Sequence, residues 1–165
     1  MWNSCYFYSI ICQKMEALLF NGEHPAKVDD KGRVVLPSPF KKQMEKAGKD
    51  RFIARKGFHH NCIVLYTPEE WYRLHQDLSV KTDPFNPVHK NIMRAKNKSV
   101  FEVTIAENGR MLIPRRFLDL IGIKKDVIIV GEFETIEIWD MEQYDQIDDN
   151  NIDFSIIRNQ DETPQ

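Results

Sequence analysis

The amino-acid sequence predicts a mainly β protein with short helices, in which two copies of one small unit form a single barrel. Three observations predict it: an internal repeat, a glycine-containing turn at the same place in each copy, and aliphatic segments of strand length around each turn. A length of 165 residues fits one domain or two small intertwined units. Closing both sets of strands into one barrel would remove the exposed edges that isolated hairpins leave.

The repeat consists of two matched blocks. DDKGRVVLPSPF at 29–40 aligns with AENGRMLIPRRF at 106–117, at a constant offset of 77 residues. CIVLYTPEEW at 62–71 aligns with TIEIWDMEQY at 135–144, at an offset of 73 residues. Two blocks in the same order indicate duplication. We therefore expect a first repeat at 15–81, a linker helix within 82–98, and a second repeat at 99–147.

Each repeat predicts the same order of elements: a strand, a tight turn, a second strand that stops at a proline, a short helix, two more strands and a closing helix. The predicted strands with clear limits lie at 23–28, 51–55, 62–66, 99–105, 126–130 and 134–139. Ser38 is the expected cap of the short helix in the first repeat, and Gly48 and Gly122 suit the helix exits. A capping box at Thr67–Glu70 predicts the start of the closing helix.

The two ends of the chain differ from this pattern. Residues 1–14 form an N-terminal extension whose apolar stretch is too short to span a membrane, and it lacks the basic start and cleavage site of a signal peptide. Met15 is a candidate start. Residues 148–165 are acidic and poor in apolar pattern, so we expect a disordered tail. Three cysteines, an odd number without framework spacing, favour a reduced, cytoplasmic setting.

Charge is distributed unevenly along the chain. The formal net charge is −2, but residues 140–165 hold eight acidic residues and one basic residue. The remaining 139 residues carry a net charge of +5. A basic body with an acidic tail suits an anionic partner, although a solubilising tail on an ordinary domain explains the charges equally well.

The Gly–Arg pairs of the two turns are the main candidate binding residues. Gly32 and Gly109 tolerate the positive φ of a turn, and they place Arg33 and Arg110 at equivalent positions. Arginine binds phosphate or guanine in bidentate fashion, asparagine binds adenine, and a two-stranded ribbon can enter the major groove. Nearby side chains that could join this contact are Lys27, Lys31 and Asn108. The alternative, more common for surface arginines, is that Asp29 or Glu107 pairs with the arginine and pins the turn.

Other polar clusters are weaker candidates. Arg115 and Arg116, on the predicted short helix of the second repeat, could contact phosphates, although a solvated helix face is the more common explanation. The His59–His60–x–Cys62 fragment has no second cluster to complete a zinc site, so we expect no metal and no cofactor, and instead a loop with a half-buried Cys62 at the start of a strand. No catalytic motif or paired acid–base group stands out, and core packing explains Tyr66 and Trp139 better than base stacking. We expect that the chain is not an enzyme.

The repeated segments resemble the MraZ family of bacterial transcription regulators. The resemblance is carried by EHPAKVDDKGRVVLP, HHNCIVLYTPEEW, VTIAENGRMLIP and VIIVGEFETIEIWD, and it runs from about Met15 to Tyr144. It implies AbrB-like repeats that fold into one double-psi-type swapped-hairpin barrel. It also implies a ring-shaped homo-oligomer, associated with the nucleoid, that binds direct repeats of double-stranded DNA upstream of its own division and cell-wall gene cluster.

The resemblance also assigns the DNA contact to the family's D-x-x-x-R turn. That motif is intact from Asp29 to Arg33, whereas Ala106 stands at the aspartate position four residues before Arg110. The linker MRAKNK at 93–98 is more basic than the resemblance implies, and residues 1–14 have no family counterpart. The linker helix at 86–97 and the helix at 68–78 are the expected contacts between subunits.

Two other functional classes remain open from the sequence. An antitoxin-type module with the same hairpin unit would bind a toxin partner as well as DNA, but such proteins usually carry one copy and a toxin-binding tail. A carbohydrate- or nucleotide-processing barrel enzyme would need a polar catalytic cluster, and none is evident.

Overall fold

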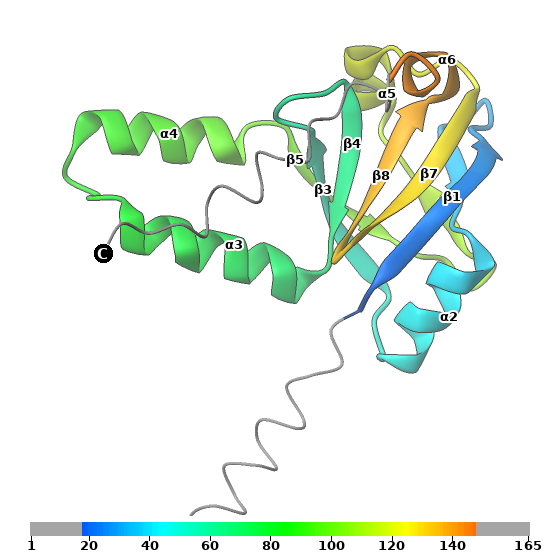
Figure 1. Ribbon diagram of the computed structural model, residues 1–165, viewed down its shortest axis with the longest axis horizontal. Coiled ribbons are helices and arrows are strands. Elements are labelled where there is room, and N and C mark those ends of the chain that lie inside the picture. The colour runs from blue at the N-terminus through cyan, green and yellow to red at the C-terminus, as the bar shows by residue number, and fades with distance from the viewer. Residues whose placement is uncertain (1–17, 148–165) are drawn as a thin grey trace, which may run out of the picture.

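The computed structural model describes residues 18–147, and it shows a β body from which a pair of helices projects (Figure 1). The N-terminal extension at 1–14 and the acidic tail at 148–165 lie outside the described residues. The strands are β1 (Phe20–Lys27), β2 (Arg33–Val35), β3 (Arg51–Lys56), β4 (Cys62–Tyr66), β5 (Val100–Thr104), β6 (Arg110–Leu112), β7 (Asp126–Phe133) and β8 (Thr135–Asp140). The helices are α2 (Ser38–Lys46), α3 (Pro68–Lys81), α4 (Pro87–Asn97), α5 (Arg115–Ile121) and α6 (Met141–Tyr144). None of the helices within 18–147 is long and apolar enough to cross a membrane.

The two repeats exchange strands within one antiparallel sheet. The first strand of each repeat pairs with the third strand of the other, β1 with β7 and β5 with β3. The third and fourth strands of each repeat form a hairpin, and β4 pairs with β8 across the middle, giving the order β1-β7-β8-β4-β3-β5. The fold is thus a swapped-hairpin barrel, and the predicted class is confirmed.

The short strands β2 and β6 pair with each other and form a separate two-stranded ribbon. The sequence pattern predicted a hairpin across each turn, but the strand that leaves each turn forms its ladder with the other repeat. A lone hairpin with a three-residue strand is at best marginally stable in water. Exchanging these strands brings the apolar faces of both repeats into one core.

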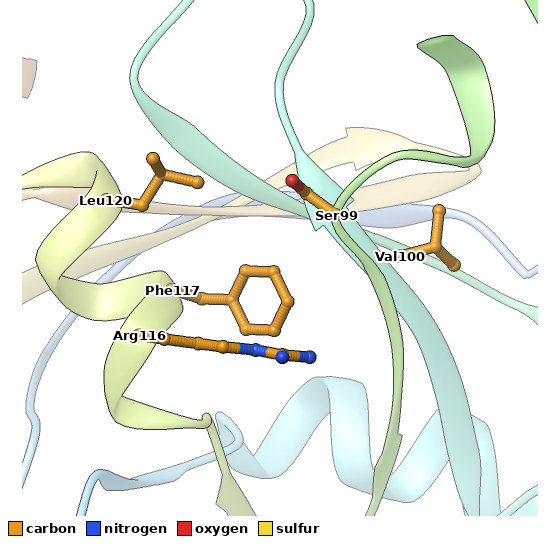
Figure 2. A pocket seen from close by; sticks show the side chains of 5 residues that line it. All are labelled: Ser99, Val100, Arg116, Phe117 and Leu120. Atoms are coloured by element: carbon orange, nitrogen blue, oxygen red, sulfur yellow. The ribbon is translucent and has the colours of Figure 1, made fainter. Parts of the chain in front are cut away.

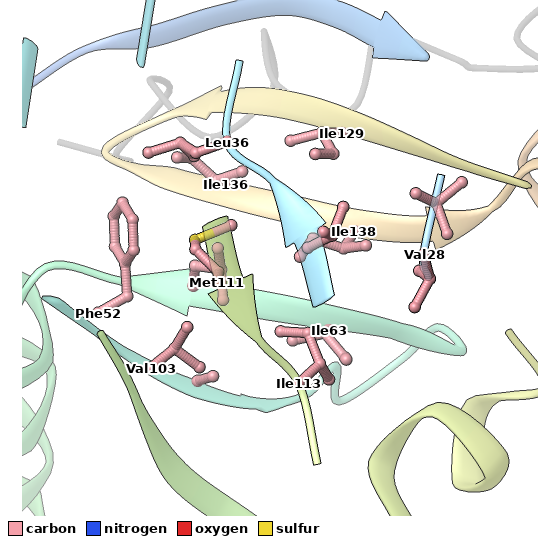
Figure 3. Packing of buried hydrophobic residues seen from close by; sticks show 14 of the residues in the cluster. Val28, Leu36, Phe52, Ile63, Val103, Met111, Ile113, Ile129, Ile136 and Ile138 are labelled. Carbon is pink, nitrogen blue, oxygen red and sulfur yellow. The ribbon is translucent and has the colours of Figure 1, made fainter. Parts of the chain in front are cut away.

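The core lies between the ribbon and the inner face of the six-stranded sheet. Val34 and Met111, which are paired in register at the middle of the ribbon, are buried. Figure 3 shows Met111 among side chains of the sheet strands, including Phe52 and Ile136. Because the inward residues of both repeats belong to this one cluster, neither repeat buries its apolar face alone.

The helix ends follow the sequence signals, with one correction. Ser38 is not a cap: it is the first residue of α2, and the first helical hydrogen bond runs from the Lys41 N–H to the Pro37 carbonyl (2.9 Å). Proline at 37 already has the extended conformation of a cap, so the helix begins one residue earlier than predicted. At α3 the Thr67 hydroxyl accepts the Glu70 N–H (3.3 Å), which confirms the predicted cap. Gly122 ends α5 with φ of +78°.

A second apolar cluster lies away from the main core. It contains Cys62, Val64, Ile128 and Trp139. Cys62 is fully buried, although the sequence suggested half burial, because it faces Trp139 directly across β4 and β8. Burial raises the pKa of its thiol to about 12. Tyr66 packs against Trp71 with ring centroids 5.4 Å apart, so packing does account for the aromatic pair Tyr66 and Trp139.

Helices α3 and α4 form a helical arm, residues 68–97, that projects from the β body (Figure 1). No side chain of either helix is buried. The base of α3 is held by Arg73, which bonds both Glu70 (2.6 Å) and Glu134 of the β7–β8 turn (2.7 Å). The arm leaves large apolar side chains in solvent, namely Tyr72, Val80, Phe85, Val88 and Ile92.

Candidate nucleic-acid interface

Turn 1, residues 29–33, is held by the carboxylate of Asp29. Its Oδ1 accepts the backbone N–H groups of Lys31 (3.0 Å) and Arg33 (2.9 Å), and its Oδ2 accepts the Arg33 Nε–H (2.7 Å). The hydrogen bond from the Arg33 backbone is the main cause that lowers the pKa of Asp29. Gly32 has φ of +80°, and a Cβ there would lie 2.6 Å from the Ile113 carbonyl oxygen, so only glycine fits.

Turn 2, residues 106–110, follows the same backbone path without an aspartate. The Ala106 N–H donates to the Arg110 carbonyl (2.9 Å), and the Gly109 N–H donates to the Ala106 carbonyl (2.7 Å), as the equivalent groups do in turn 1. The Asn108 Oδ1 accepts the Arg110 N–H (3.1 Å) and so replaces one bond of the missing carboxylate. A bidentate contact of Asn108 with adenine would have to share that oxygen.

The ribbon brings the two arginines onto one face. In its register Arg33 lies opposite Leu112, and Val35 lies opposite Arg110. Residues directly opposite each other in an antiparallel pair, and alternate residues along a strand, point to the same side. Since Val34 and Met111 face the core, these four side chains share the outer face of the ribbon. The turns themselves lie at opposite ends of the ribbon because its strands are antiparallel.

The two arginines differ in their local partners. Arg33 is half-buried and gives its Nε–H to Asp29, while no described residue accepts a hydrogen bond from its two Nη groups. The alternative in which Asp29 pairs with Arg33 and pins the turn is therefore seen in the structure. The pair still leaves the two Nη groups of the guanidinium able to donate hydrogen bonds to a ligand. Arg110 is exposed, and its side chain makes no hydrogen bond or ion pair within residues 18–147.

The two lysines lie on the turn 1 side. Lys27 ends β1 and faces Asp126 of β7, with its Nζ 3.5 Å from the carboxylate. Lys31 is exposed in the turn itself. Turn 1 therefore has two cationic side chains, Lys31 and Arg33, against Arg110 alone in turn 2, but Asp29 and Asp30 bring its formal charge to zero, as Glu107 does for turn 2.

Arg115 and Arg116 do not join the ribbon face. Helix α5 starts beside turn 1, since the Ile113 N–H donates to the Gly32 carbonyl (2.9 Å). Arg115 pairs with Asp119 one turn along the helix (3.3 Å). Figure 2 shows Arg116 beside the Phe117 ring, 4.7 Å from its centroid, in a shallow pocket that Ser99, Val100 and Leu120 also line. Local contacts therefore account for the placement of both side chains.

The histidine–cysteine fragment holds no ligand set. Cys62 is buried, and His60 lies against Trp139 with ring centroids 5.3 Å apart. In the part of the chain that the structure describes, no three His, Cys, Asp or Glu side chains gather where they could hold a metal ion.

Sequence reasoning missed Val35 and Leu112. Both aliphatic side chains are more than half exposed on the ribbon face, at 51% and 57%. The signal was present in the alternation of Arg33-Val34-Val35 and Arg110-Met111-Leu112, because period two places the first and third residues on one side. Without the strand pairing, however, nothing placed the two triplets side by side.

The fold and the ribbon define a duplicated swapped-hairpin barrel whose outer ribbon face presents one arginine from each repeat. Comparison of the sequence with models of known families also finds two matching segments, one for each repeat. The family model described as "MraZ protein, putative antitoxin-like" matches residues 19–91 and 99–164. The chain belongs to the MraZ family.

Curated relatives match over most of their own length. The Transcriptional regulator MraZ of Phocaeicola vulgatus is 40% identical over 127 residues, covering 77% of this chain and 82% of the relative. The protein of the same name from Bacteroides fragilis is 37% identical over 128 residues, covering 78% and 81%. That of Clostridium tetani is 33% identical over 139 residues, covering 84% and 94%.

Proposed function

We propose that this chain is a sequence-specific DNA-binding transcriptional regulator whose ribbon face enters the major groove, and that it acts in the cytoplasm on the nucleoid. The observation that carries the proposal is the position of the half-buried Arg33 and the exposed Arg110 on one face of an antiparallel ribbon. Such a ribbon has the width that the major groove accepts, and arginine reads guanine through two parallel hydrogen bonds. The relatives named as transcriptional regulators support this function.

The proposed target is a set of direct repeats in the chain's own upstream region, at the head of a division and cell-wall gene cluster. The proposed contact residues are Lys27, Lys31, Arg33, Asn108 and Arg110. Phosphate contacts by lysines would position the ribbon, and base contacts by arginines would carry the sequence preference. Regulation of transcription, and no chemical conversion, is the activity proposed here.

Binding titrations of Arg33→Ala and Arg110→Ala test the proposal. The duplexes are the upstream repeats and a scrambled sequence of equal composition. Losing a bidentate base contact should weaken specific binding by about 1–3 kcal/mol per subunit site and relax sequence preference. We expect the larger loss for Arg33, because Asp29 orients its guanidinium and no carboxylate orients Arg110.

Arg51→Ala is the matched comparison. It also removes an exposed arginine with a local carboxylate partner, Glu102 at 3.6 Å, but from β3 of the six-stranded sheet. Thermal melts of all three variants separate binding from folding. Normal binding by Arg33→Ala, or binding lost only through melting, would make turn 1 structural. If Arg33→Ala weakens binding equally on both duplexes, and the dependence of log affinity on log salt concentration becomes shallower by about one, then Arg33 contacts a phosphate and no base.

We also propose that the chain forms a closed homo-oligomer in which the helical arm contacts a second copy. The arm exposes five large apolar side chains that no residue within 18–147 covers. Exposed apolar patches of this kind mark interfaces, and symmetric closure would bury one on every subunit. Light scattering should give a mass of several subunits. The double variant Val88→Ser, Ile92→Ser should lower that mass, whereas a monomer at all micromolar concentrations contradicts the proposal.

An antitoxin-type module is the second candidate, favoured by the antitoxin-like description of the matching family. Such a module would hold a small toxic protein as well as DNA. Co-purification of one stoichiometric partner with the full chain would support this function, and a homogeneous homo-oligomer active on DNA would support the first.

A further inference from the structure

We propose that Val35 and Leu112 are specificity-determining residues that contact the C5-methyl groups of thymine, beside the guanines read by Arg33 and Arg110. This inference rests on the proposed function and deepens it. It starts from the juxtaposition of two aliphatic and two cationic side chains on the outer face of the ribbon.

The ribbon face has a two-fold pattern. Each arginine stands opposite an aliphatic residue of the other repeat, Arg33 opposite Leu112 and Arg110 opposite Val35. The arginines therefore occupy one diagonal of the face and the aliphatic residues occupy the other. Both repeats supply the same two chemical types, although their triplets differ in sequence.

The exposed aliphatic residues are not needed by the core. Val34 and Met111, the inward residues of the same strands, are almost fully buried and belong to the main cluster. Val35 and Leu112 are 51% and 57% exposed, each opposite an arginine on a face whose other members are cationic. The exposed carboxylates nearby, Asp30 and Glu107, belong to the two turns at the ribbon's ends.

Duplex DNA is the partner whose chemistry matches this mixture. The major groove offers guanine O6 and N7 to arginine, and the thymine methyl is an apolar feature that aliphatic side chains contact there. The positive charge of both arginines complements the phosphates that line the groove. A protein partner with an apolar patch would have no comparable use for both cations.

The spacing within the ribbon fits successive base pairs. Alternate residues of one strand lie about 6.5–6.8 Å apart, which is close to two base-pair steps of about 3.4 Å. An arginine and the aliphatic residue two positions away on its strand would therefore meet bases about two steps apart. The proposal thus expects thymines about two steps from the guanines of each subunit site.

The test replaces thymine by deoxyuridine, which removes the C5-methyl group and keeps every hydrogen-bonding group. The probe is the duplex that the wild-type protein selects from a randomised pool, with each thymine replaced in turn. At the contacted positions wild-type affinity should fall about three- to fivefold, the value of transferring one methyl group out of water. Val35→Ala and Leu112→Ala should bind the thymine duplex more weakly and lose the difference between thymine and deoxyuridine at one position each.

Leu120→Ala is the matched control, because Leu120 is 50% exposed on α5, outside both the ribbon face and the helical arm, and it should keep the full thymine preference. The proposal is overturned if no replacement of thymine by deoxyuridine changes wild-type affinity, or if the selected duplex has no thymine about two steps from the guanines. It is also overturned if Val35→Ala and Leu112→Ala keep the preference for thymine over deoxyuridine. A changed oligomer mass for Val35→Ala or Leu112→Ala would overturn it in favour of an interface between copies. Failure of the wild type to select any duplex would instead remove the proposed function itself.

Discussion

Turn 1 and turn 2 have the same backbone and different side-chain support. In both turns the backbone N–H of the first residue donates to the carbonyl of the arginine four positions later, and the glycines have φ of +80° and +77°. In turn 1 the Asp29 carboxylate accepts three hydrogen bonds, one of them from the Arg33 side chain. In turn 2 Ala106 offers none, and Asn108 binds only the Arg110 backbone.

The comparison separates two roles that the D-x-x-x-R pattern combines. The aspartate is not required to form the turn, because turn 2 forms without one. What turn 2 lacks is a group that orients the arginine side chain. We therefore assign the main effect of Asp29 to the position of Arg33, and the shape of both turns to their glycines.

Substituting the two turn glycines should separate the turns most strongly. Gly32→Ala places a Cβ 2.6 Å from the Ile113 carbonyl in addition to an unfavourable φ, so it should destabilise the fold by about 2–4 kcal/mol. Gly109→Ala meets the Lys41 side chain at 3.2 Å, which can move, and the Leu36 carbonyl only at an ordinary contact distance of 3.9 Å, so its cost should be about 1–2 kcal/mol.

Urea unfolding of both variants measures this difference. Gly48→Ala is the control for the backbone cost alone, because Gly48 has φ of +67° and nothing within 4 Å of its added Cβ. Equal destabilisation by Gly32→Ala and Gly109→Ala would mean that turn 1 is not packed against α5 as closely as the structure shows.

Removing the aspartate from turn 1, or adding one to turn 2, should change the affinity for DNA in opposite directions. Asp29→Ala releases the Arg33 side chain, and ordering it again on binding should cost about 0.5–1.5 kcal/mol of specific affinity. Ala106→Asp should act in the opposite direction at turn 2, by less, because Asn108 already holds part of that turn.

Titration of specific and scrambled duplexes distinguishes orientation from charge. Asp30→Ala removes an exposed carboxylate from the same turn without touching Arg33, so it should raise the affinity for both duplexes slightly. If Asp29→Ala behaves like Asp30→Ala, Asp29 acts only through its charge. The different side-chain support of the two turns would then have no effect on DNA recognition.

The smallest effect concerns the acid range. In the folded protein the Asp29 pKa lies below 3.8, chiefly because the Arg33 backbone amide bonds its ionised form. The stabilisation that ionised Asp29 contributes to the folded protein is therefore present above pH 3.8, and it is lost as the pH falls through the lowered pKa. A carboxyl NMR titration should find this low pKa, and Arg33→Ala should raise it part of the way, since both backbone amides remain. An ordinary pKa for Asp29 would show that the hydrogen bonds of its carboxylate to Lys31 and Arg33 do not persist in solution.

Much of the fold could be predicted from the sequence because its signals are local. The duplicated blocks, the glycines of the turns and the Thr67 cap each act through neighbouring residues, and the strands of both repeats lie close to their predicted limits. Ser38 was misassigned because Pro37 can serve as a cap through its conformation alone. Cys62 was judged half-buried because its cross-strand neighbour Trp139 is 77 residues away in the sequence.

The candidate site depended more heavily on tertiary structure. The sequence by itself determined two equivalent arginines, each after a glycine at positive φ, with an aspartate before only one of them. Only the tertiary structure decided that both arginines share a face, because the pairing of β2 with β6 joins strands from different repeats. It also decided that Arg115 and Arg116 lie outside that face and that Val35 and Leu112 lie on it. Alternation along a strand assigns sides within three residues, but long-range pairing decides which strands are neighbours.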